Sequence, residues 1–430
     1  MLGAFARALR TPDLRKKILF TLGIIVLFRV GSSIPGPGVS TAVIHHCLKA
    51  TQNNSVYQLV NLFSGGALLQ LSIFALGITP YITSSIIIQL LVVVIPRLDR
   101  LKQEGSSGEQ KLTQYTRYLT VALGILQSTG IVALARTGRL FPSCDTGNKI
   151  IPDTSIFRII TLVVTITAGT AVIMWLGELI TGRGIGNGMS LLIFTSIAAQ
   201  LPSQGGSILA AAGGKIFSVV ILLGVAIVVA VVFVEQCQRR IPVQYAKRLI
   251  GRRLYGGTST YIPMKVNQAG VIPVIFASSL LQLPQLASTI WNNRGFTNFV
   301  QKYLVRGDHP LYLAGFFALI MFFTYFYVAI TFNPTEVADN MKKYGGFIPG
   351  IRPGNPTAEY LDHVLSRITL PGSIFLGIIC VAPLALLGLT KGVSFPFGGT
   401  AVLIMVGVGL DTVKQIESQL QLRNYEGFLR

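Results

Sequence analysis

Residues 77–90 read GITPYITSSIIIQL, and a near copy, GVIPVIFASSLLQL, lies 193 positions further on at residues 270–283. Six aligned positions are identical: Gly77/Gly270, Pro80/Pro273, Ile82/Ile275, Ser85/Ser278, Gln89/Gln282 and Leu90/Leu283. Apolar segments match easily by chance, but agreement at glycine, proline, serine and glutamine is harder to obtain from composition. The pair therefore indicates an internal repeat. Both copies begin Gly-x-x-Pro, which favours an irregular start to each helix.

The rest of the chain is too apolar for a soluble domain. Hydrophobic residues make up 51% of the 430 positions, charged residues only 12%, and the mean hydropathy is +0.61. Soluble domains contain about 25% charged residues. Disordered, collagen-like and coiled-coil chains are excluded because their charge content or repeat period differs. The composition predicts an all-α polytopic membrane protein.

Stretches without Asp, Glu, Lys or Arg predict ten membrane-spanning helices, each needing about 20 apolar residues. They lie at 18–28 (extended to about Gly31), within 50–96, and at 118–135, 159–177, 184–214, 216–234, 266–293, 309–335, 368–390 and 392–410. The repeated segments are then the second and seventh spans, so the chain divides into two halves of five. An odd number of spans inverts the second half, and inverted repeats place a path at their interface.

The predicted parts are a basic amphipathic segment at 1–17, an N-terminal half at 18–204, an external hinge loop at 205–215, a C-terminal half at 216–416 and a tail at 417–430. With the N-terminus inside, 25 Lys and Arg residues fall in loops on that side and 10 on the other. The positive-inside rule therefore predicts cytoplasmic termini. Topology explains most of the net charge of +20, and docking of an acidic partner such as RNA or lipid is the alternative.

The run at 50–96 is too long for one helix. Residues 62–76 are apolar but too short to span, and they contain the Gly65–Gly66 pair. We interpret them as a re-entrant segment, which is tolerated only where protein or water surrounds the backbone. An interfacial helix lying flat is the alternative.

No residue pattern predicts catalysis, a metal site or a cofactor. Ion-coupled transporters place ionisable residues inside their spans, whereas Glu178 and Glu235 lie at predicted cytoplasmic ends and Asp411 at the last exit. The pair His45–His46 with Cys47 is interpreted as a loop cluster, not a metal site. The glycines at 182, 184, 186 and 188 predict a tight turn between spans, and the chain has no phosphate-loop motif.

Six dispersed segments resemble the SecY family, the central channel of the Sec translocon. They are NLFSGGALLQLSIFALGITPYITSSIIIQLL (61–91), MWLGELITGRGIGNGMS (174–190), CQRRIPVQYAKR (237–248), KVNQAGVIPVIFASSL (265–280), NPTEVADNMKKYGGFIPGIRPG (333–354) and FPFGGTAVLIMVGVGLDTVKQ (395–415). The resemblance runs from Arg15 to the C-terminus and is to bacterial forms. It implies ten helices in two inverted halves around an hourglass pore.

The resemblance further implies a pore ring of aliphatic side chains and a re-entrant plug helix that closes the outer funnel. The ring residues are Ile78, Ile82, Met189, Ile193, Ile275 and Ile404, where Met189 departs from the usual aliphatic type. The plug residues are Asn61, Leu62, Phe63, Ser64, Gly65, Gly66, Ala67, Leu68, Leu69 and Gln70. Apolar constrictions exclude ions by dewetting, so such a ring would seal the channel.

The family's lateral gate lies between spans 2–3 and 7–8 and corresponds here to Ile86, Gln89, Gln127, Ser128, Asn267, Ser278 and Ser279. Gln127 and Asn267 are expected to hydrogen-bond across the closed gate; ordinary polar contact between helices is the alternative. The family's docking surface for the SecA motor and the ribosome corresponds to Arg239, Arg240, Lys247, Arg248, Arg252, Arg253 and Arg352. A solvated loop that only sets topology is the alternative.

The expected function is a protein-conducting channel in the plasma membrane. It would pass unfolded secretory polypeptides and release transmembrane segments laterally into the bilayer. Implied partners are SecE-like and SecG-like small subunits, SecA, the ribosome, signal sequences and nascent polypeptides, and the phospholipid bilayer. The competing classes are an inverted-repeat secondary transporter and a structural scaffold for insertion factors.

Overall fold

The two repeated segments form helices that begin at equivalent positions. In the computed structural model, α5 spans Thr79–Val94 and α10 spans Ile272–Ile290, so each helix begins two residues after the shared glycine. Gly77 and Gly270 both have positive φ, at 56° and 61°. Only glycine adopts this backbone region without steric cost. The irregular start predicted for both copies is confirmed.

The structure describes residues 11–44, 66–68, 70–136, 151, 155–245, 248–250, 253–255, 259–290, 295, 299–300, 303, 309–389 and 399–428. In these residues, six helices are long and apolar enough to cross a membrane: Ser106–Arg136, Ile156–Arg183, Phe217–Gln236, Pro310–Lys343, Asn355–Leu384 and Gly399–Gln421. A seventh span results if α5 and α6 (Pro96–Gln103), which meet at a bend of 100°, count together. The chain is therefore a multi-pass helical membrane protein.

The described part of each predicted run overlaps a helix or one arm of a helix. The remaining bounds are α2 (Pro12–Ser33), α7 (Ser106–Arg136), α8 (Ile156–Arg183), α9 (Gly188–Gln236), α12 (Pro310–Thr331), α13 (Pro334–Lys343), α14 (Asn355–Leu389) and α15 (Gly399–Phe428). Helix α2 begins at Pro12, before the predicted boundary at residue 18. The predicted tail at 417–430 continues α15 as far as Phe428.

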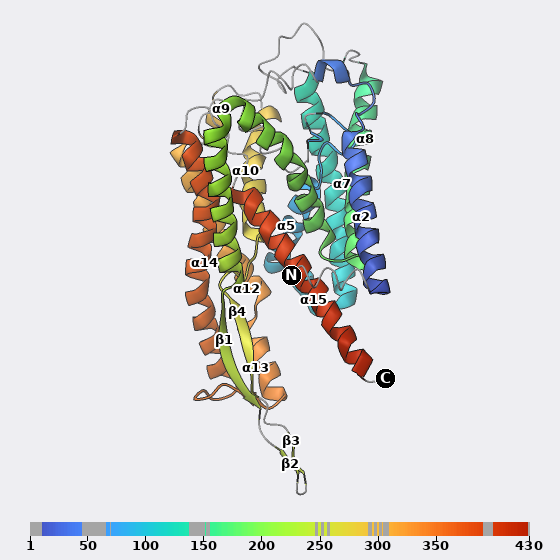
Figure 1. The fold of residues 1–430 in the computed structure, drawn as a ribbon. Helices are drawn as coiled ribbons and strands as arrows, with labels where there is room; N and C mark the ends of the chain where they lie inside the picture. Colours follow the sequence, from blue (N-terminus) through green and yellow to red (C-terminus); the bar gives the residue numbers. More distant parts are fainter. Residues whose placement is uncertain are drawn as a thin grey trace.

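The segment predicted as a hinge loop, 205–215, is helical on both sides of one break. Helix α9 continues through these residues, and its backbone leaves the helical region only at Gly213, with φ 75° and ψ 169°. The helix consequently forms an arch of two arms (Figure 1). The Gly- and Ser-rich composition suggested a flexible connection, but one left-handed glycine suffices to reverse the chain.

Two glycine contacts recur at equivalent places in the two halves. A Cβ added to Gly169 in α8 would overlap the carbonyl oxygen of Ile73, and one added to Gly372 in α14 would overlap that of Val266. Ile73 and Val266 each lie four residues before the glycine of their repeat. The two helices concerned are the fourth and ninth spans. The repeat thus extends beyond α5 and α10 to the helices against which their preceding segments pack.

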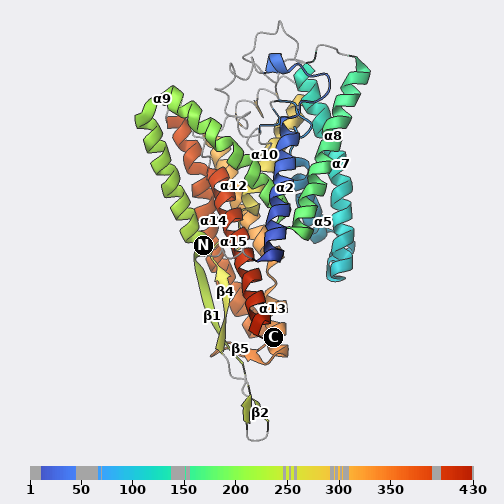
Figure 2. The ribbon, with the colours of Figure 1, turned by 45° about the vertical axis from the view of Figure 1, so that its right-hand side comes forward.

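A small β-structure extends from one end of the helical bundle (Figures 1 and 2). Its strands are β1 (Gln238–Tyr245), β2 (Arg248–Ile250), β3 (Arg253–Tyr255), β4 (Ser259–Lys265) and β5 (Gly346–Phe347). Three of them form an antiparallel sheet in the order β4–β1–β5, and β2–β3 is a separate hairpin near the tip. Ile241, Val243 and Met264 face a core shared with α13 and α14. The sequence analysis treated these strands as loop.

Candidate functional site

The six predicted ring residues share one apolar cluster. Ile78, Ile193, Ile275 and Ile404 are buried in it, and Ile82 and Met189 pack against it. Ile82 lies in α5 and Ile78 directly precedes that helix. The others lie in the first arm of α9, in α10 and in α15, so both halves contribute. The cluster contains aliphatic and aromatic side chains throughout. The structure therefore brings the six predicted ring residues together in an apolar environment.

Met189 departs from an isoleucine ring, and its surroundings show how it fits. Its sulfur lies where a side chain on Gly177 of α8 would stand. The turn between α8 and α9 is as tight as predicted, because Gly188 approaches the carbonyl of Gly177 closely. Asn187 caps α9 by accepting hydrogen bonds from the amides of Met189 and Ser190, at 3.1 and 3.3 Å. A flexible thioether fills such an irregular gap well.

The described residues before α5, 66–68 and 70–78, which we call the first lead-in, form turns apart from Ser72, which makes an isolated β-bridge with Pro35. Backbone hydrogen bonds fix it to the end of α2, with Gly36 N donating to Leu71 O at 2.9 Å and Ile73 N donating to Ile34 O at 3.0 Å. Leu71 is buried despite a positive φ of 45°. Irregular backbone surrounded by protein is what the re-entrant interpretation requires.

Only part of the predicted plug lies in the described residues. Gly66, Ala67, Leu68 and Gln70 are described and form turns, with Ala67 and Leu68 buried. The other predicted plug residues, Asn61 to Gly65 and Leu69, lie outside the described residues. Further along the first lead-in, Phe74 joins the apolar cluster and stacks on Phe28 of α2, with ring centroids 6.0 Å apart. The segment therefore reaches the ring directly.

The helices predicted to form the lateral gate are in contact. α10 packs against α5 and α7, and Ile86 shares an apolar cluster with Val274 and Phe276. Gln127, Ser128 and Ser279 are buried, whereas Gln89 is exposed. Ser128 lies 3.1 Å from the hydroxyl of Thr167, and Ser278 donates to Ile275 O at 2.9 Å. The contact between the two sets of helices is mainly apolar.

The expected hydrogen bond between Gln127 and Asn267 is wrong. The side-chain amide of Asn267 donates to Glu235 Oε1 at 2.7 Å and to Gly270 O at 3.2 Å. Glu235 is the penultimate residue of α9 and is only 7% exposed. Its position at a helix end suggested a solvated charge, so the sequence analysis did not pair it. Asn267 is bound to a residue of its own half.

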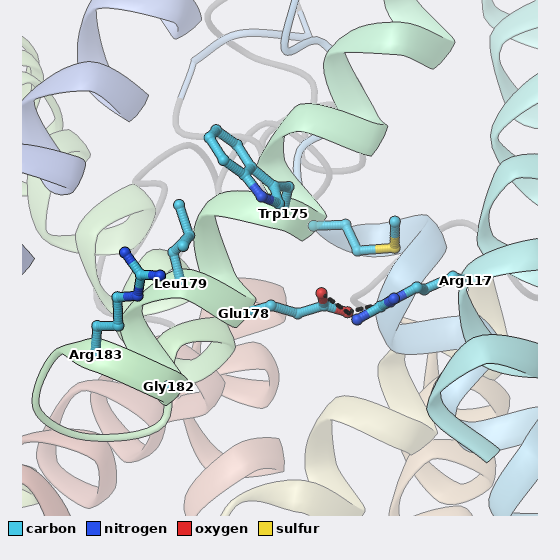
Figure 3. Close-up of a pocket in the computed structure, with 7 residues that line it drawn as sticks. Arg117, Trp175, Glu178, Leu179, Gly182 and Arg183 are labelled. Carbon is cyan, nitrogen blue, oxygen red and sulfur yellow. Dashed lines mark hydrogen bonds and ion pairs between the residues drawn. The ribbon is translucent and has the colours of Figure 1, made fainter. Parts of the chain in front are cut away.

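A pocket of about 640 Å³ lies between α7 and α8. Figure 3 shows Arg117 and Glu178 facing each other across it, beside Trp175. Arg117 Nε and Nη2 donate to the two oxygens of Glu178, each at 2.8 Å. Bidentate guanidinium–carboxylate pairs fix geometry well. The sequence analysis placed Glu178 at a span end but did not predict its partner.

The predicted docking residues lie on or beside the β-structure. Arg239, Arg240 and Arg352 are exposed, and the Arg240 guanidinium stacks 4.8 Å above the Tyr261 ring. Arg352 lies in the turn before α14, where its carbonyl accepts from the Thr357 hydroxyl at 2.9 Å. Arg248 and Arg253 lie in β2 and β3, and Lys247 and Arg252 lie outside the described residues. In the described part of the chain, no three His, Cys, Asp or Glu residues form a group suited to a metal.

Two inverted helical halves, sealed from each other by an aliphatic cluster and preceded by a buried irregular segment, define a class. This class is the multi-pass helical membrane protein whose two pseudo-symmetric halves meet in a buried apolar cluster.

Comparisons with known proteins identify the family. The SecY family profile matches residues 72–413. Protein translocase subunit SecY of Streptomyces galbus is 65% identical over 437 positions, and that of Mycobacterium bovis is 60% identical over 443, each covering all of both chains. This chain belongs to the SecY family. The resemblance drawn from the six segments is confirmed, and the secondary-transporter alternative is not supported.

Solved structures agree on the fold. "The structure of a protein conducting channel" matches with a TM-score of 0.62 at 19% identity, covering 94% of this chain and 91% of that one. A SecY structure described by its plug domain, which stabilises the closed state, matches at 0.61 and 18% with the same coverage. Sec61 in a canine ribosome–channel complex matches at 0.59 and 17%, again with that coverage.

Proposed function

We propose that this chain is the central protein-conducting subunit of a bacterial Sec translocon. It passes unfolded secretory polypeptides across the plasma membrane and releases transmembrane segments laterally into the bilayer. One observation carries the proposal: the six ring residues, drawn from both halves, meet in a single apolar cluster. The family relatives, named protein translocase subunits, support it.

An aliphatic ring suits a channel that must accept any sequence. Narrow apolar constrictions exclude ions because water leaves them. The ring side chains of α5, α9, α10 and α15 have no polar partner to recognise a particular cargo, so a threading polypeptide can part them. The same side chains close again once the polypeptide has left. The chain itself catalyses no covalent step in this proposal, and the energy comes from the motor or the ribosome.

The plug provides a second closure on the outer side. Its described end is buried, with Leu68 in an apolar cluster shared with α7 and α8, and the first lead-in continues from there to Phe74 in the ring cluster, which supports a role in sealing. Displacement of residues 61–70 would expose the ring alone to the incoming polypeptide. The plug domain in the related SecY structure, described as stabilising the closed state, supports this role.

The lateral gate lies between α5–α7 and α10–α12. Its apolar contact, formed by Ile86 with Val274 and Phe276, can be replaced by an apolar signal helix of similar character. A weakly apolar signal gains less from this exchange. The gate therefore selects signals by hydrophobicity rather than by sequence.

The β-structure and the turn at Arg352 form the docking surface for SecA and the ribosome. Their exposed arginines suit an anionic RNA or acidic protein surface. The Sec61 structure in a ribosome–channel complex supports this assignment. The β-structure and both termini are cytoplasmic in this proposal, and SecE-like and SecG-like subunits complete the assembly.

The docking assignment is tested by charge reversal at one exposed position. Arg352→Glu should reduce SecA-driven export about tenfold by removing a contact to an anionic surface, while membrane insertion of the chain itself stays intact. Export is measured with purified SecA and vesicles at two salt concentrations. Normal export would remove Arg352 from the docking surface.

Site-specific crosslinking tests the pathway. A photoreactive residue placed at Ile82 or at Ile275 should crosslink a stalled secretory precursor. The matched control is Leu222, which is 73% exposed on the outer arm of α9. Equal crosslinking at all three positions would argue against a conduit along α5 and α10.

Two further outcomes separate the competing classes. Deleting residues 61–70 should produce an ion current in planar bilayers, and replacing ring isoleucines by asparagine should increase it. A scaffold for insertion factors would give no current. A secondary transporter would instead take up a small solute without the precursor.

A further inference from the structure

We propose that Glu235 is a positioning residue that anchors the start of α10 to α9 and thereby sets how hydrophobic a signal must be to open the gate. This inference rests on the proposed channel function. It assigns a role to a carboxylate that neither the ring, the plug, the predicted gate nor the docking surface includes.

The anchor is built from two buried side chains. Asn267 is 3% exposed and Glu235 is 7% exposed, and their hydrogen bond of 2.7 Å joins α9 to the segment before α10. The same Asn267 amide also donates to Gly270 O at 3.2 Å. One amide group therefore holds both the adjoining helix and the left-handed turn from which α10 starts.

The residues around this bond form one continuous unit. Residues 266–271, which we call the second lead-in, follow β4 directly, and Val266 N donates to Cys237 O at 3.0 Å. Lys265 lies 3.9 Å from Asp411 of α15. The second lead-in is thus attached to α9 and to the residue between α9 and β1, and the strand before it contacts α15. Of these attachments, the Glu235–Asn267 bond lies nearest to the first turn of α10.

Only the Glu235 bond ties the Asn267 side chain to another helix among the described residues. Asn267 Oδ1 has no hydrogen-bond partner among the described residues, and neither has the buried Oε1 of Gln268 next to it. The Nδ2 bonds are therefore what fixes the Asn267 side chain. A buried polar group that loses its partner is costly because water cannot replace it. Removing the Glu235 acceptor should loosen the start of α10 specifically.

Loosening this start bears directly on the gate. Further along the helix, Ile275 contributes to the ring, and Val274 and Phe276 form the apolar contact with Ile86 of α5. A helix whose first turn is free can tilt away from α5 at lower cost. The structure assigns the anchor wholly to the C-terminal half, so it acts on α10 without bridging the gate.

Export of two precursors measures the effect. One carries a strongly apolar signal and the other a signal with a shortened apolar core. Glu235→Leu should raise export of the weak-signal precursor about fivefold, since one buried hydrogen bond is lost, and leave the strong-signal precursor within about twofold. Asn267→Leu should give the same result, and the double variant should add little further.

Conservative variants separate positioning from general damage. Glu235→Gln retains an oxygen acceptor for Asn267 and should behave like the parent chain. Asn267→Asp places a second carboxylate against that of Glu235, so the two repel and export of the weak-signal precursor should rise. Glu235→Gln in the Asn267→Asp background restores a donor–acceptor pair and should restore stringency. Glu109→Leu, which removes an exposed carboxylate from the start of α7, is the control.

The outcomes are distinguishable. If weak-signal export stays at the parental level in both Glu235→Leu and Asn267→Asp, the anchor is overturned. If Glu235→Leu fails to accumulate in the membrane, the Asn267→Asp variant and its combination with Glu235→Gln still test the proposal. In these two variants stringency is expected to be lost and then restored without any apolar substitution. Absence of precursor crosslinks at Ile82 and Ile275 in the parent chain would instead overturn the channel function itself.

Discussion

The two repeat helices share a register but are held in place by different chemistry. α5 and α10 each begin two residues after a left-handed glycine, and each contributes to the ring. The first lead-in is fixed by backbone hydrogen bonds to residues 34 and 36 and by the stack of Phe74 on Phe28. The second lead-in is fixed by the backbone hydrogen bond from Val266 N to Cys237 O and by the side-chain bond between Glu235 and Asn267.

This difference suits the two helices to different tasks, although they share the repeated motif. Packing of aromatic and aliphatic side chains around the first lead-in excludes water, which suits the segment next to the plug. Directed hydrogen bonds from a buried side chain fix position with little aromatic packing, which suits a helix that must move. The shared motif determines where each helix begins, and the lead-in determines how firmly it is held.

The largest expected effect comes from removing the aromatic stack between Phe74 and Phe28. Phe74→Ala leaves a cavity beside Phe28 and should cost about 3 kcal/mol or more of unfolding free energy. Thermal unfolding in detergent measures it, and vesicles that contain the variant should also leak salt. Phe322, an aromatic residue of α12 that is 59% exposed, is the matched control. Equal losses for Phe74→Ala and Phe322→Ala would contradict the assignment.

The next effect tests whether the two halves are equivalent. An added methyl in Gly169→Ala overlaps Ile73 O, and one in Gly372→Ala overlaps Val266 O. Each should cost about 1–3 kcal/mol through forced backbone movement.

Gly315→Ala in α12 is the control, because nothing lies within 4 Å of its added Cβ. It should be neutral or stabilise the helix by up to about 1 kcal/mol. A cost confined to one of the two close-approach glycines would show that the halves are not packed alike. The readout is again the midpoint of thermal unfolding.

The sequence predicted the repeat in its correct register because glycine and proline constrain the backbone locally. It also predicted the re-entrant segment, since an apolar run of that length cannot span. The break between the two arms of α9 falls at Gly213, inside the hinge predicted at 205–215, but the helical backbone around it was not predicted because small residues suit both a loop and a helical break. The β-structure was missed because its short strands carry arginine and proline, which the charge count assigned to loops.

The partners of polar residues were harder to predict than their burial. Gln127 and Asn267 are both buried as the gate assignment requires. Their pairing was not foreseeable, since Glu235 is 32 residues away from Asn267 and reaches it only through the hairpin of β1 and β4. Arg117 and Glu178 are 61 residues apart and meet in the same way, through the packing of α7 on α8. Spacing in the sequence carries no signal for such contacts.

The smallest expected effect concerns a buried hydroxyl that takes part in none of the contacts described for the two lead-ins. Ser72 is fully buried in the first lead-in, and its hydroxyl has no partner among the described residues. Ser72→Ala should therefore stabilise the protein slightly, by up to about 1 kcal/mol, because an unsatisfied buried group is removed.

Ser84 in α5 is equally buried but donates to Pro80 O at 2.8 Å, so Ser84→Ala should cost about 1 kcal/mol instead. Opposite signs for these two serines would show that the first lead-in depends on packing and backbone bonds alone. A destabilising Ser72→Ala would show that the hydroxyl has a hydrogen-bond partner outside the described residues, and both lead-ins would then rely on a polar side-chain contact.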